Sequence, residues 1–218
     1  MTAEAPTGRT ARRQRVGFPR RLLDLLAGSV GLLVVCLPLL LLMLAVRLES
    51  RGPALFRQIR LGERGRPFIL YKLRTMRTGS TGLEITTADD PRVTRLGRLL
   101  RRTSLDELPQ LWHVVRGQMT LVGPRPETPA LAEAYPPDCR WVLDHRPGLT
   151  GPAQVRLRDT DILGTADANT TAAYLSQIVP ARTAIEAVYL RNPTLAATLG
   201  VLVDTVRHLL GRPVPPQH

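Results

Sequence analysis

Residues 101 to 127 read RRTSLDELPQLWHVVRGQMTLVGPRPE, and this stretch places two adjacent carboxylates, Asp106 and Glu107, among arginines. Arg101 precedes the acid pair by one to two helical turns. Arg125 follows the pair and lies between two prolines, which restrict the backbone. Little conformational entropy is therefore lost when the Arg125 guanidinium binds a ligand. Arginine side chains bind phosphate oxygens through paired hydrogen bonds, so these cations can converge on one phosphorylated ligand. The stretch therefore predicts a phosphate-binding site.

The acid pair is predicted to lie at the start of a helix that begins near Asp106 and ends at Gly117. Ser104 resembles the first residue of a capping box. A helix capped there would carry Pro109 beyond its first turn, where the ring clashes with an earlier carbonyl. A start at Asp106 avoids this clash and puts both acids where free amides and the helix dipole favour anions. Adjacent acids are also common at the start of helices that have no catalytic or binding function, so the pair alone does not show that this is a functional site.

A β-hairpin is predicted between Ala54 and Met76, where two short apolar runs flank a turn-rich connection. Lys72 and Arg74 lie two residues apart on its second strand, so they are expected on one face and are counted as phosphate-binding residues. Lys72 is the single lysine among 30 Lys and Arg residues. A compact ammonium group binds a phosphate differently from a guanidinium, which would explain a lysine at this position. The alternative is that this one lysine is present by chance.

The acid pair also fits a magnesium ion. Mg²⁺ is usually bound by one or two carboxylates together with substrate phosphates. Asp106 and Glu107 can supply the carboxylates, and the surrounding arginines can hold the phosphates. We therefore expect Mg²⁺ as the cofactor.

Residues 25 to 46 carry no charged side chain, and this run is long enough to cross a bilayer, which takes about 20 apolar residues. Arginines flank the run on both sides, which conflicts with the positive-inside rule for a simple span. Pro38 lies inside the run and is predicted to break the helix, so that the chain enters and leaves on the cytoplasmic face. An ordinary kinked span is the alternative, because transmembrane helices tolerate proline.

Composition favours an anionic partner. The formal net charge is +12, which suits lipid headgroups, nucleotide phosphates or nucleic acid. Aromatic residues make up only 4% of the chain, which argues against base-stacking surfaces for single-stranded nucleic acid. Two distant cysteines, Cys36 and Cys139, do not form a disulfide framework, so the main domain is expected in the cytoplasm.

The expected fold is α+β and predominantly helical, with a compact catalytic domain, a small β-hairpin, a re-entrant N-terminal membrane helix and interfacial amphipathic helices. The expected division is a disordered basic tail over 1–16, a membrane anchor over 17–48, the catalytic domain over 49–210 and a tail over 211–218. A mobile loop is expected over 78–91 and another loop over 147–151. Further helices are expected over 92–102, 128–135, 140–144 and 194–210.

Four segments together resemble the bacterial sugar transferase family, the monotopic phosphoglycosyl transferases. They are KLRTM at 72–76, TSLDELPQLW at 103–112, LVGPRPE at 121–127 and RPGLTGPAQV at 146–155. The resemblance extends from about Arg20 to Val206. It implies the short form of the family, which needs no partner domain for its chemistry.

This resemblance implies transfer of a sugar 1-phosphate from a UDP-sugar to undecaprenyl phosphate, with release of UMP and the start of a surface glycan. Asp106 is the implied nucleophile, which forms a covalent phosphosugar intermediate, and Glu107 helps bind Mg²⁺. Lys72, Arg101 and Arg125 match positions suited to holding phosphates. The implied partners are the UDP-sugar, the polyprenyl phosphate and the membrane, without nucleic acid; a homodimer is left open.

The sequence departs from the family pattern at several neutral positions. Leu73 stands where the family often has Phe, His113 where it often has Asn, and Leu37 where Ser usually precedes the helix-breaking proline. Two rival functions stay open. One is a non-catalytic single-span protein with a basic lipid- or nucleic-acid-binding domain. The other is a membrane enzyme that transfers the sugar alone and releases UDP.

Overall fold

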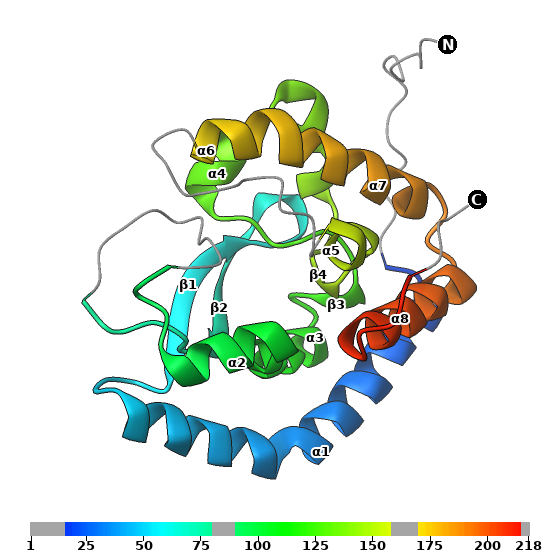
Figure 1. Cartoon of the computed structure of the whole chain (residues 1–218). Helices are drawn as coiled ribbons and strands as arrows, with labels where there is room; N and C mark the ends of the chain where they lie inside the picture. The colour runs from blue at the N-terminus through cyan, green and yellow to red at the C-terminus, as the bar shows by residue number, and fades with distance from the viewer. Residues whose placement is uncertain (1–15, 80–89, 158–169, 215–218) are drawn as a thin grey trace.

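The computed structural model describes residues 16–79, 90–157 and 170–214, which form mostly helices and two small sheets (Figure 1). The elements are α1 Phe18–Glu49, β1 Leu55–Leu61, η1 Glu63–Gly65, β2 Pro67–Leu73, α2 Arg95–Thr103, η2 Leu105–Gln110, α3 Leu111–Arg116, β3 Thr120–Val122, α4 Pro129–Glu133, η3 Pro137–Asp144, β4 Gly148–Thr150, α5 Pro152–Leu157, α6 Thr170–Ala173, η4 Tyr174–Ile178, α7 Val179–Arg191 and α8 Leu195–Leu209. The predominantly helical α+β class is confirmed. Residues 1–15 of the predicted basic tail and residues 80–89 of the predicted loop lie outside the described residues.

One of the two sheets is antiparallel and the other is parallel. Strands β1 and β2 form the predicted antiparallel hairpin, in a register that places Phe56 opposite Lys72. Strands β3 and β4 run parallel, with Thr120 opposite Gly148. This second sheet was not predicted; the interpretation of residues 147–151 as a loop was wrong for β4. Three-residue strands are too short to show a hydrophobic period, so the pairing is visible only in three dimensions.

Three groups of buried apolar side chains hold the elements together. The first joins β2, α3 and β3 to the C-terminal helices, and includes Val114, Met119 and Val122, each 0% exposed. The second packs η3 against η4 and the start of α7. The third joins the end of α1 to the hairpin and α2 through Val46 and Leu100. Each group contains residues that are far apart in sequence, so the packing joins distant segments of the chain.

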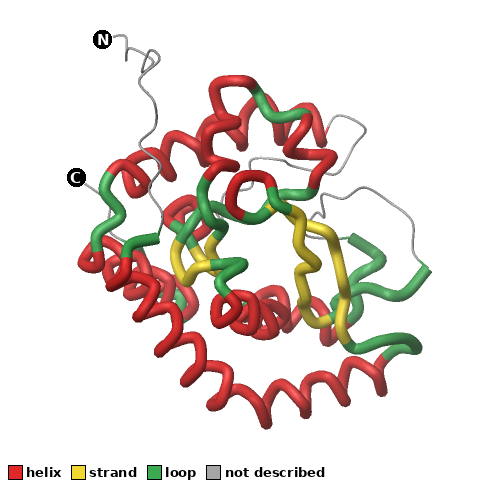
Figure 2. The backbone as a smooth tube through the Cα atoms, turned by 180° about the vertical axis from the view of Figure 1, so that it is seen from behind, coloured by secondary structure: helices red, strands yellow, loops and turns green. Residues whose placement is uncertain are grey.

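Helix α1 runs along the outside of the domain, past α8 and α3 at its N-terminal half and α2 at its C-terminal half (Figures 1 and 2). Among the described residues it is the one helix whose length and composition would allow it to cross a membrane, and its most apolar stretch is only 6% buried. The helix continues through Pro38 and bends in its middle part, so Pro38 does not divide it into two helices. Its placement in a membrane stays a prediction.

The N-terminal part of α1 is bound to the domain by two buried charged residues. Arg20 donates a hydrogen bond from Nη2 to the carbonyl oxygen of Val122 at 2.9 Å. Asp24, 1% exposed, accepts from the hydroxyl of Thr120 and, at 2.9 Å, from the backbone N–H of Leu121. Buried charges are retained only where hydrogen bonds replace lost hydration. These bonds therefore fix the start of α1 against β3.

Candidate phosphate-binding site

The acid pair lies at the start of a helical segment, as predicted. Ser104 has the left-handed backbone conformation (φ 58°) and separates α2 from η2. The η2 turn carries Asp106 and Glu107 and continues into α3, which ends at Gly117 with φ 77°. The Ser104 side chain makes no capping hydrogen bond, which confirms that the apparent capping box is not used. The carbonyl of Ser104 accepts from the N–H of Glu107 at 3.1 Å, and its own N–H donates to the carbonyl of Arg101 at 3.3 Å.

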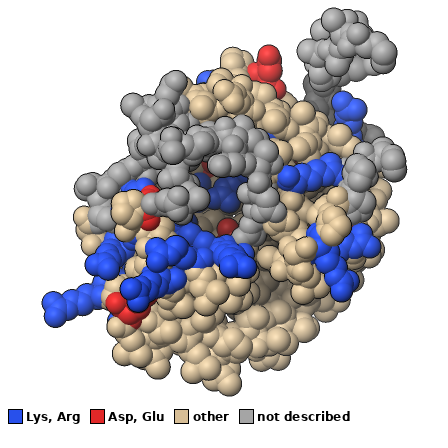
Figure 3. Space-filling view, viewed as in Figure 1, with Lys and Arg blue, Asp and Glu red and all other residues tan. Residues whose placement is uncertain are grey.

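The acid pair borders a shallow pocket that is open to solvent. Its lining residues are Arg60, Leu70, Lys72, Glu107, Gln110, Arg125, Pro126, Gly148, Leu149 and Gln154. Asp106 lies beside this lining and is 7% exposed. Figure 3 shows a hollow on this face with acidic atoms at its bottom and Lys or Arg side chains around it. The pocket therefore combines carboxylates and cations, the composition expected for a phosphate ester and its metal.

Electrostatic interactions link the predicted residues to one another. Burial raises the pKa of Asp106 to about 6, and the Glu107 charge adds to this, while Lys72 and Arg101 act in the opposite direction. Burial and the charge of Arg125 lower the pKa of Lys72 to about 8, against the attraction of Asp106. The structure thus brings these five residues close to one another: Lys72, Glu107 and Arg125 line the pocket, and Asp106 and Arg101 interact with them electrostatically. It also gives both titrating groups pKa values near neutrality, which is common at catalytic sites.

Arg101 is oriented by a neighbour from the hairpin side of the pocket. Its Nε donates to the hydroxyl of Thr75, which follows β2, at 2.8 Å. Burial lowers the pKa of Arg101, and the Asp106 charge opposes this. A guanidinium fixed in this way loses less freedom when it binds an anion.

Arg74 does not belong to this cluster, and its prediction as a phosphate-binding residue was wrong. Its buried guanidinium donates to the carbonyl oxygens of Val46 at 3.1 Å, Ser50 at 2.6 Å and Arg51 at 2.6 Å. These carbonyls lie at or just beyond the C-terminal end of α1, where helix carbonyls lack partners within the helix and a cation is favoured. Strand β2 ends at Leu73, so the two-residue spacing from Lys72 no longer places Arg74 on the same face. Arg74 instead fastens the end of α1.

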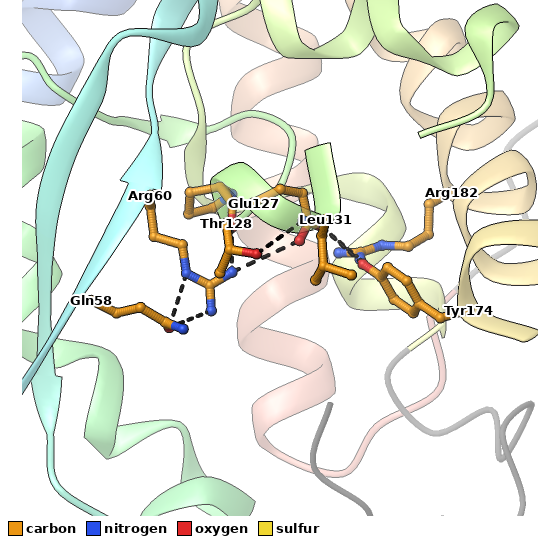
Figure 4. A network of polar contacts seen from close by, with 8 residues as sticks. Gln58, Arg60, Glu127, Thr128, Leu131, Tyr174 and Arg182 are labelled. Carbon is orange, nitrogen blue, oxygen red and sulfur yellow. Dashed lines mark hydrogen bonds and ion pairs between the residues drawn. The ribbon is translucent and has the colours of Figure 1, made fainter. Parts of the chain in front are cut away.

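The turn that carries Arg125 is held by a buried network around Glu127, which is 3% exposed (Figure 4). One Glu127 carboxylate oxygen accepts from the hydroxyl of Tyr174 at 2.8 Å and from Arg182 at 3.4 Å. The other lies 3.8 Å from Arg60, which also donates to the carbonyl of Pro126 at 3.1 Å. The network joins the hairpin to α7 through the turn. Arg125 is thereby presented at the pocket by a rigid support.

Glycines allow the second sheet to close behind this turn. A Cβ at Gly148 would lie 2.1 Å from the backbone nitrogen of Gly123, and a Cβ at Gly151 would lie 2.3 Å from the carbonyl oxygen of Gly123. No side chain fits at such distances, so glycine is required for close backbone contact. The contact places Gly148 and Leu149 in the pocket wall.

His113 supports the strand that carries Lys72. The ring is 1% exposed; its Nε2 accepts from the N–H of Tyr71 at 3.1 Å, and its Nδ1 lies 2.9 Å from Oε1 of Gln118. Burial lowers the pKa of His113, which favours the neutral ring that this acceptor role needs. The residue thus ties α3 to the free edge of β2, one residue before Lys72.

Several pocket residues were missed by the sequence analysis. Arg60, Gln110 and Gln154 line the pocket, and Glu127 supports it. The only sequence signal was the position of Gln110, Glu127 and Gln154 inside the quoted motifs, since none has a periodic or charge-pair pattern of its own. Arg60 carried no separate signal, because arginines are frequent throughout the chain.

The residues of the pocket fit a magnesium ion that is shared with substrate. Within the described ranges there is no group of three or more His, Cys, Asp or Glu side chains suited to holding a metal by themselves. Mg²⁺ does not require such a cage, because one or two carboxylates plus substrate phosphates suffice. Glu107 lines the pocket and Asp106 lies beside it, and their mutual repulsion favours binding of a cation.

Comparisons with known proteins agree with the motifs. A family model described as bacterial sugar transferase matches residues 15–212. The chain is 43% identical over 204 residues to a UDP-glucose:undecaprenyl-phosphate glucose-1-phosphate transferase of Caulobacter vibrioides, covering 91% of this chain and 72% of that protein. It is 39% identical to a putative undecaprenyl-phosphate N-acetylgalactosaminyl 1-phosphate transferase of Bacillus subtilis, covering 68% and 81%. An Escherichia coli protein with the same name as the Caulobacter one is 43% identical, over 62% of this chain and 30% of its own length.

Proposed function

Because this chain belongs to the bacterial sugar transferase family, we propose that it moves a sugar 1-phosphate from a UDP-sugar to undecaprenyl phosphate and releases UMP. Relatives named for this type of transfer support the reaction class. The observation that carries the proposal is a buried carboxylate, Asp106, beside Lys72 and Arg101 at an open pocket. The product lipid would start the assembly of a polysaccharide or glycoconjugate.

In the first step, a carboxylate oxygen of Asp106 attacks the phosphorus atom that bears the sugar. A bond forms between this oxygen and phosphorus, and the bond from phosphorus to the bridging oxygen of UMP breaks, so UMP leaves with the electron pair. Asp106 must be ionised for attack. With a pKa of about 6 it is mostly ionised at neutral pH, yet it is more basic than an exposed aspartate.

In the second step, a phosphate oxygen of undecaprenyl phosphate attacks the same phosphorus atom. The bond to Asp106 breaks, the carboxylate is restored, and the sugar becomes attached to the lipid through a diphosphate. The sum consumes one UDP-sugar and one lipid phosphate and yields one UMP and one lipid diphosphate sugar. Both displacements take place at the same phosphorus atom, so a single pocket can accommodate both steps.

Three cations of the pocket stabilise the charge on the transferring phosphate. Lys72 and Arg125 line the pocket, and Arg101 is near enough to interact electrostatically with both. Repulsion among them falls when a substrate diphosphate binds. Fixed cations that face developing charge lower the barrier to phosphoryl transfer.

Glu107, together with Asp106, is the residue that we propose holds Mg²⁺. When bound, the ion supplies further neutralisation of the substrate diphosphate. Glu107 also raises the pKa of Asp106 by repulsion, which makes the ionised carboxylate more basic but lowers the fraction of Asp106 that is ionised at a given pH.

We further propose that the domain lies on the cytoplasmic face of the membrane, with both ends of α1 on that face. Arg20 and Asp24 bind the start of the helix to β3, and Arg74 binds its end next to the hairpin. A helix that crossed the bilayer would separate these two attachments by the membrane thickness, about 30 Å of hydrocarbon. The attachments therefore favour a re-entrant placement.

The proposal is tested by identifying the nucleotide released from a panel of UDP-sugars with undecaprenyl phosphate and Mg²⁺ in detergent. Wild type is expected to release UMP, and Asp106→Asn to release none. Asp138→Asn, an exposed acid on η3, is the matched control and is expected to act as wild type. Release of UDP would assign the sugar-transfer alternative, and full activity of Asp106→Asn would exclude the proposed nucleophile.

A further inference from the structure

A group of hydrogen-bond acceptors lies behind the pocket without matching donors. Gln154 of α5 lines the pocket, and its Oε1 is buried. Glu186 of α7 is 3% exposed and both of its carboxylate oxygens are buried. Within the described part of the chain, none of these three oxygens has a partner at hydrogen-bond distance and angle, although the backbone N–H of Ala153 is near enough to Glu186 to lower its pKa. A buried acceptor without a donor destabilises the folded protein, so we expect a hydrogen-bond donor to bind here.

These acceptors surround one small space next to Gly151. A Cβ at Gly151 would lie 2.3 Å from Gln154 Oε1, 2.3 Å from the carbonyl oxygen of Gly123 and 3.1 Å from Glu186 Oε1. The absence of a side chain at Gly151 is therefore what allows the carboxylate, the amide and the carbonyl to approach. Glu186 stands behind Gln154 as seen from the pocket, because Gln154 lines the pocket and Glu186 does not.

An amide can satisfy Glu186 and bind a ligand at the same time. The glutamine side chain carries two N–H donors on one side and an acceptor oxygen on the other. In the structure Oε1 is the buried atom on the Glu186 side. Exchange of the amide oxygen and nitrogen, which have nearly the same shape, would let Nε2 donate to the Glu186 carboxylate and leave Oε1 to accept a hydrogen bond from the pocket. Burial raises the pKa of Glu186 to about 7 and the charge of Arg182 opposes this, so the ionised form is available at neutral pH.

The charge distribution of the pocket indicates which part of a ligand lies here. Phosphates are drawn to Lys72 and Arg125, and the oxygens of Gln154 and Glu186 repel them. The ligand group at the Gln154 side must donate a hydrogen bond. In a nucleotide sugar the donors next to the diphosphate are the hydroxyl groups of the ribose and of the sugar.

We propose that Gln154 is a specificity residue that accepts a hydrogen bond from a hydroxyl group of the nucleotide-sugar donor, and that Glu186 is a positioning residue that fixes the orientation of the Gln154 amide. This inference rests on the proposed function, since it takes a UDP-sugar as the ligand. A site built to bind a hydroxyl discriminates against an analogue that lacks it, because its buried polar group is then left unpaired.

The test measures binding by calorimetry in an Asp106→Asn background, which prevents turnover. The ligands are a UDP-sugar, its 2′-deoxyribose analogue, and analogues that lack single hydroxyls on the sugar. The parent protein is expected to bind one deoxy analogue about tenfold or more weaker than the full donor. Weaker binding of the 2′-deoxyribose analogue would show that Gln154 binds the ribose hydroxyl. Weaker binding of a deoxy-sugar analogue would show that it binds that hydroxyl of the sugar. Gln154→Ala is expected to reduce this ratio to near one.

Glu186→Gln is expected to reduce the same ratio, because a neutral amide no longer fixes the direction of Gln154. The double variant is expected to show no further loss beyond Gln154→Ala, since Glu186 acts through Gln154. Glu133→Gln and Gln177→Ala, two exposed residues, are the matched controls and should keep the ratio of the parent protein. Thermal unfolding of each variant separates lost binding from lost folding.

A ratio that Gln154→Ala leaves unchanged would overturn the inference, as would a parent protein that binds no donor. An additional loss in the double variant would overturn the positioning role of Glu186. These results are distinct from failure of the proposed function, which is decided separately by the nucleotide that wild type releases with the lipid phosphate present.

Discussion

Asp106 and Lys72 share one partly buried site, and burial moves their pKa values toward each other, to about 6 and about 8. Desolvation disfavours the charged form of both groups, which raises the pKa of an acid and lowers that of an amine. Their mutual attraction reduces both shifts without cancelling them. At neutral pH the site therefore contains an ionised nucleophile and a protonated lysine together.

This pair predicts a bell-shaped pH dependence of kcat/KM for UMP release. Activity should rise as Asp106 ionises, with increasing pH through about 6, and should fall as Lys72 loses its proton through about 8. Lys72→Arg should keep the acidic limb and lose the alkaline one, because a guanidinium stays protonated. An alkaline limb that persists unchanged in Lys72→Arg would show that another group causes it.

Arg74 is predicted to contribute to stability and not to substrate binding. Arg74→Met removes three hydrogen bonds to carbonyls at the end of α1 and should lower the free energy of unfolding by about 3 kcal/mol. Denaturant unfolding in detergent measures this loss. Arg66→Met, an exposed arginine of the hairpin connection, is the control and should change little. Equal effects in the two variants would contradict the assigned role.

At the scale of single elements, the short β3–β4 sheet positions the pocket wall through backbone contact alone. A Cβ at Gly148 would meet the nitrogen of Gly123 at 2.1 Å and the carbonyl oxygen of Thr150 at 2.3 Å. Both are backbone atoms, which cannot move without separating the strands. The sheet therefore depends on glycine at this position more than on side-chain packing.

Gly148→Ala is predicted to lower the free energy of unfolding by about 3 kcal/mol, because the new methyl group overlaps backbone. Gly200→Ala supplies a matched control of opposite sign. Gly200 lies inside α8 with no atom within 4 Å of its Cβ position, so alanine should stabilise the helix by up to about 1 kcal/mol. The two variants are compared by thermal unfolding; similar changes in melting temperature would contradict the account.

Local signals predicted some elements well and others not at all. The hairpin and the segment from η2 to α3 were predicted because turn residues, Pro109 and Gly117 leave local marks in the sequence. The pairing of β3 with β4 leaves none, since Thr120 and Gly148 meet only after folding. The acid pair and three of the predicted cations lie within or beside one sequence motif or one strand, and the structure brings them close to one another, whereas it places Arg74 at the end of α1. Its partners are carbonyls of a helix far upstream, which no spacing rule reveals.

At the scale of the whole molecule, the two attachments of α1 constrain how the protein sits in a membrane. The start of the helix is fixed to β3 through Arg20 and Asp24, and its end is fixed by Arg74. Its surface between these points is apolar and largely exposed, and its length and composition suit a lipid environment. Both ends are therefore expected on the side of the membrane where the domain lies.

Cysteine labelling in sealed vesicles tests this arrangement. Gly17→Cys and Arg51→Cys place a thiol just before and just after α1, each in a Cys36→Ser, Cys139→Ser background. Both thiols should react with a membrane-impermeant maleimide from the same side. Cys36, retained alone within the apolar stretch, is the control and should react only after detergent is added. Reaction of the two ends from opposite sides would establish a spanning helix.

The central claim is that Asp106 carries the phosphosugar between donor and lipid. The most direct measurement is mass spectrometry of peptides from protein incubated with a UDP-sugar and Mg²⁺ and without undecaprenyl phosphate. We expect a phosphosugar adduct on the peptide that contains Asp106 in wild type, its disappearance when undecaprenyl phosphate is added, and no adduct in Asp106→Asn. UMP release that requires the lipid and leaves Asp106 unmodified at every time point would contradict the covalent account and indicate direct transfer to the lipid.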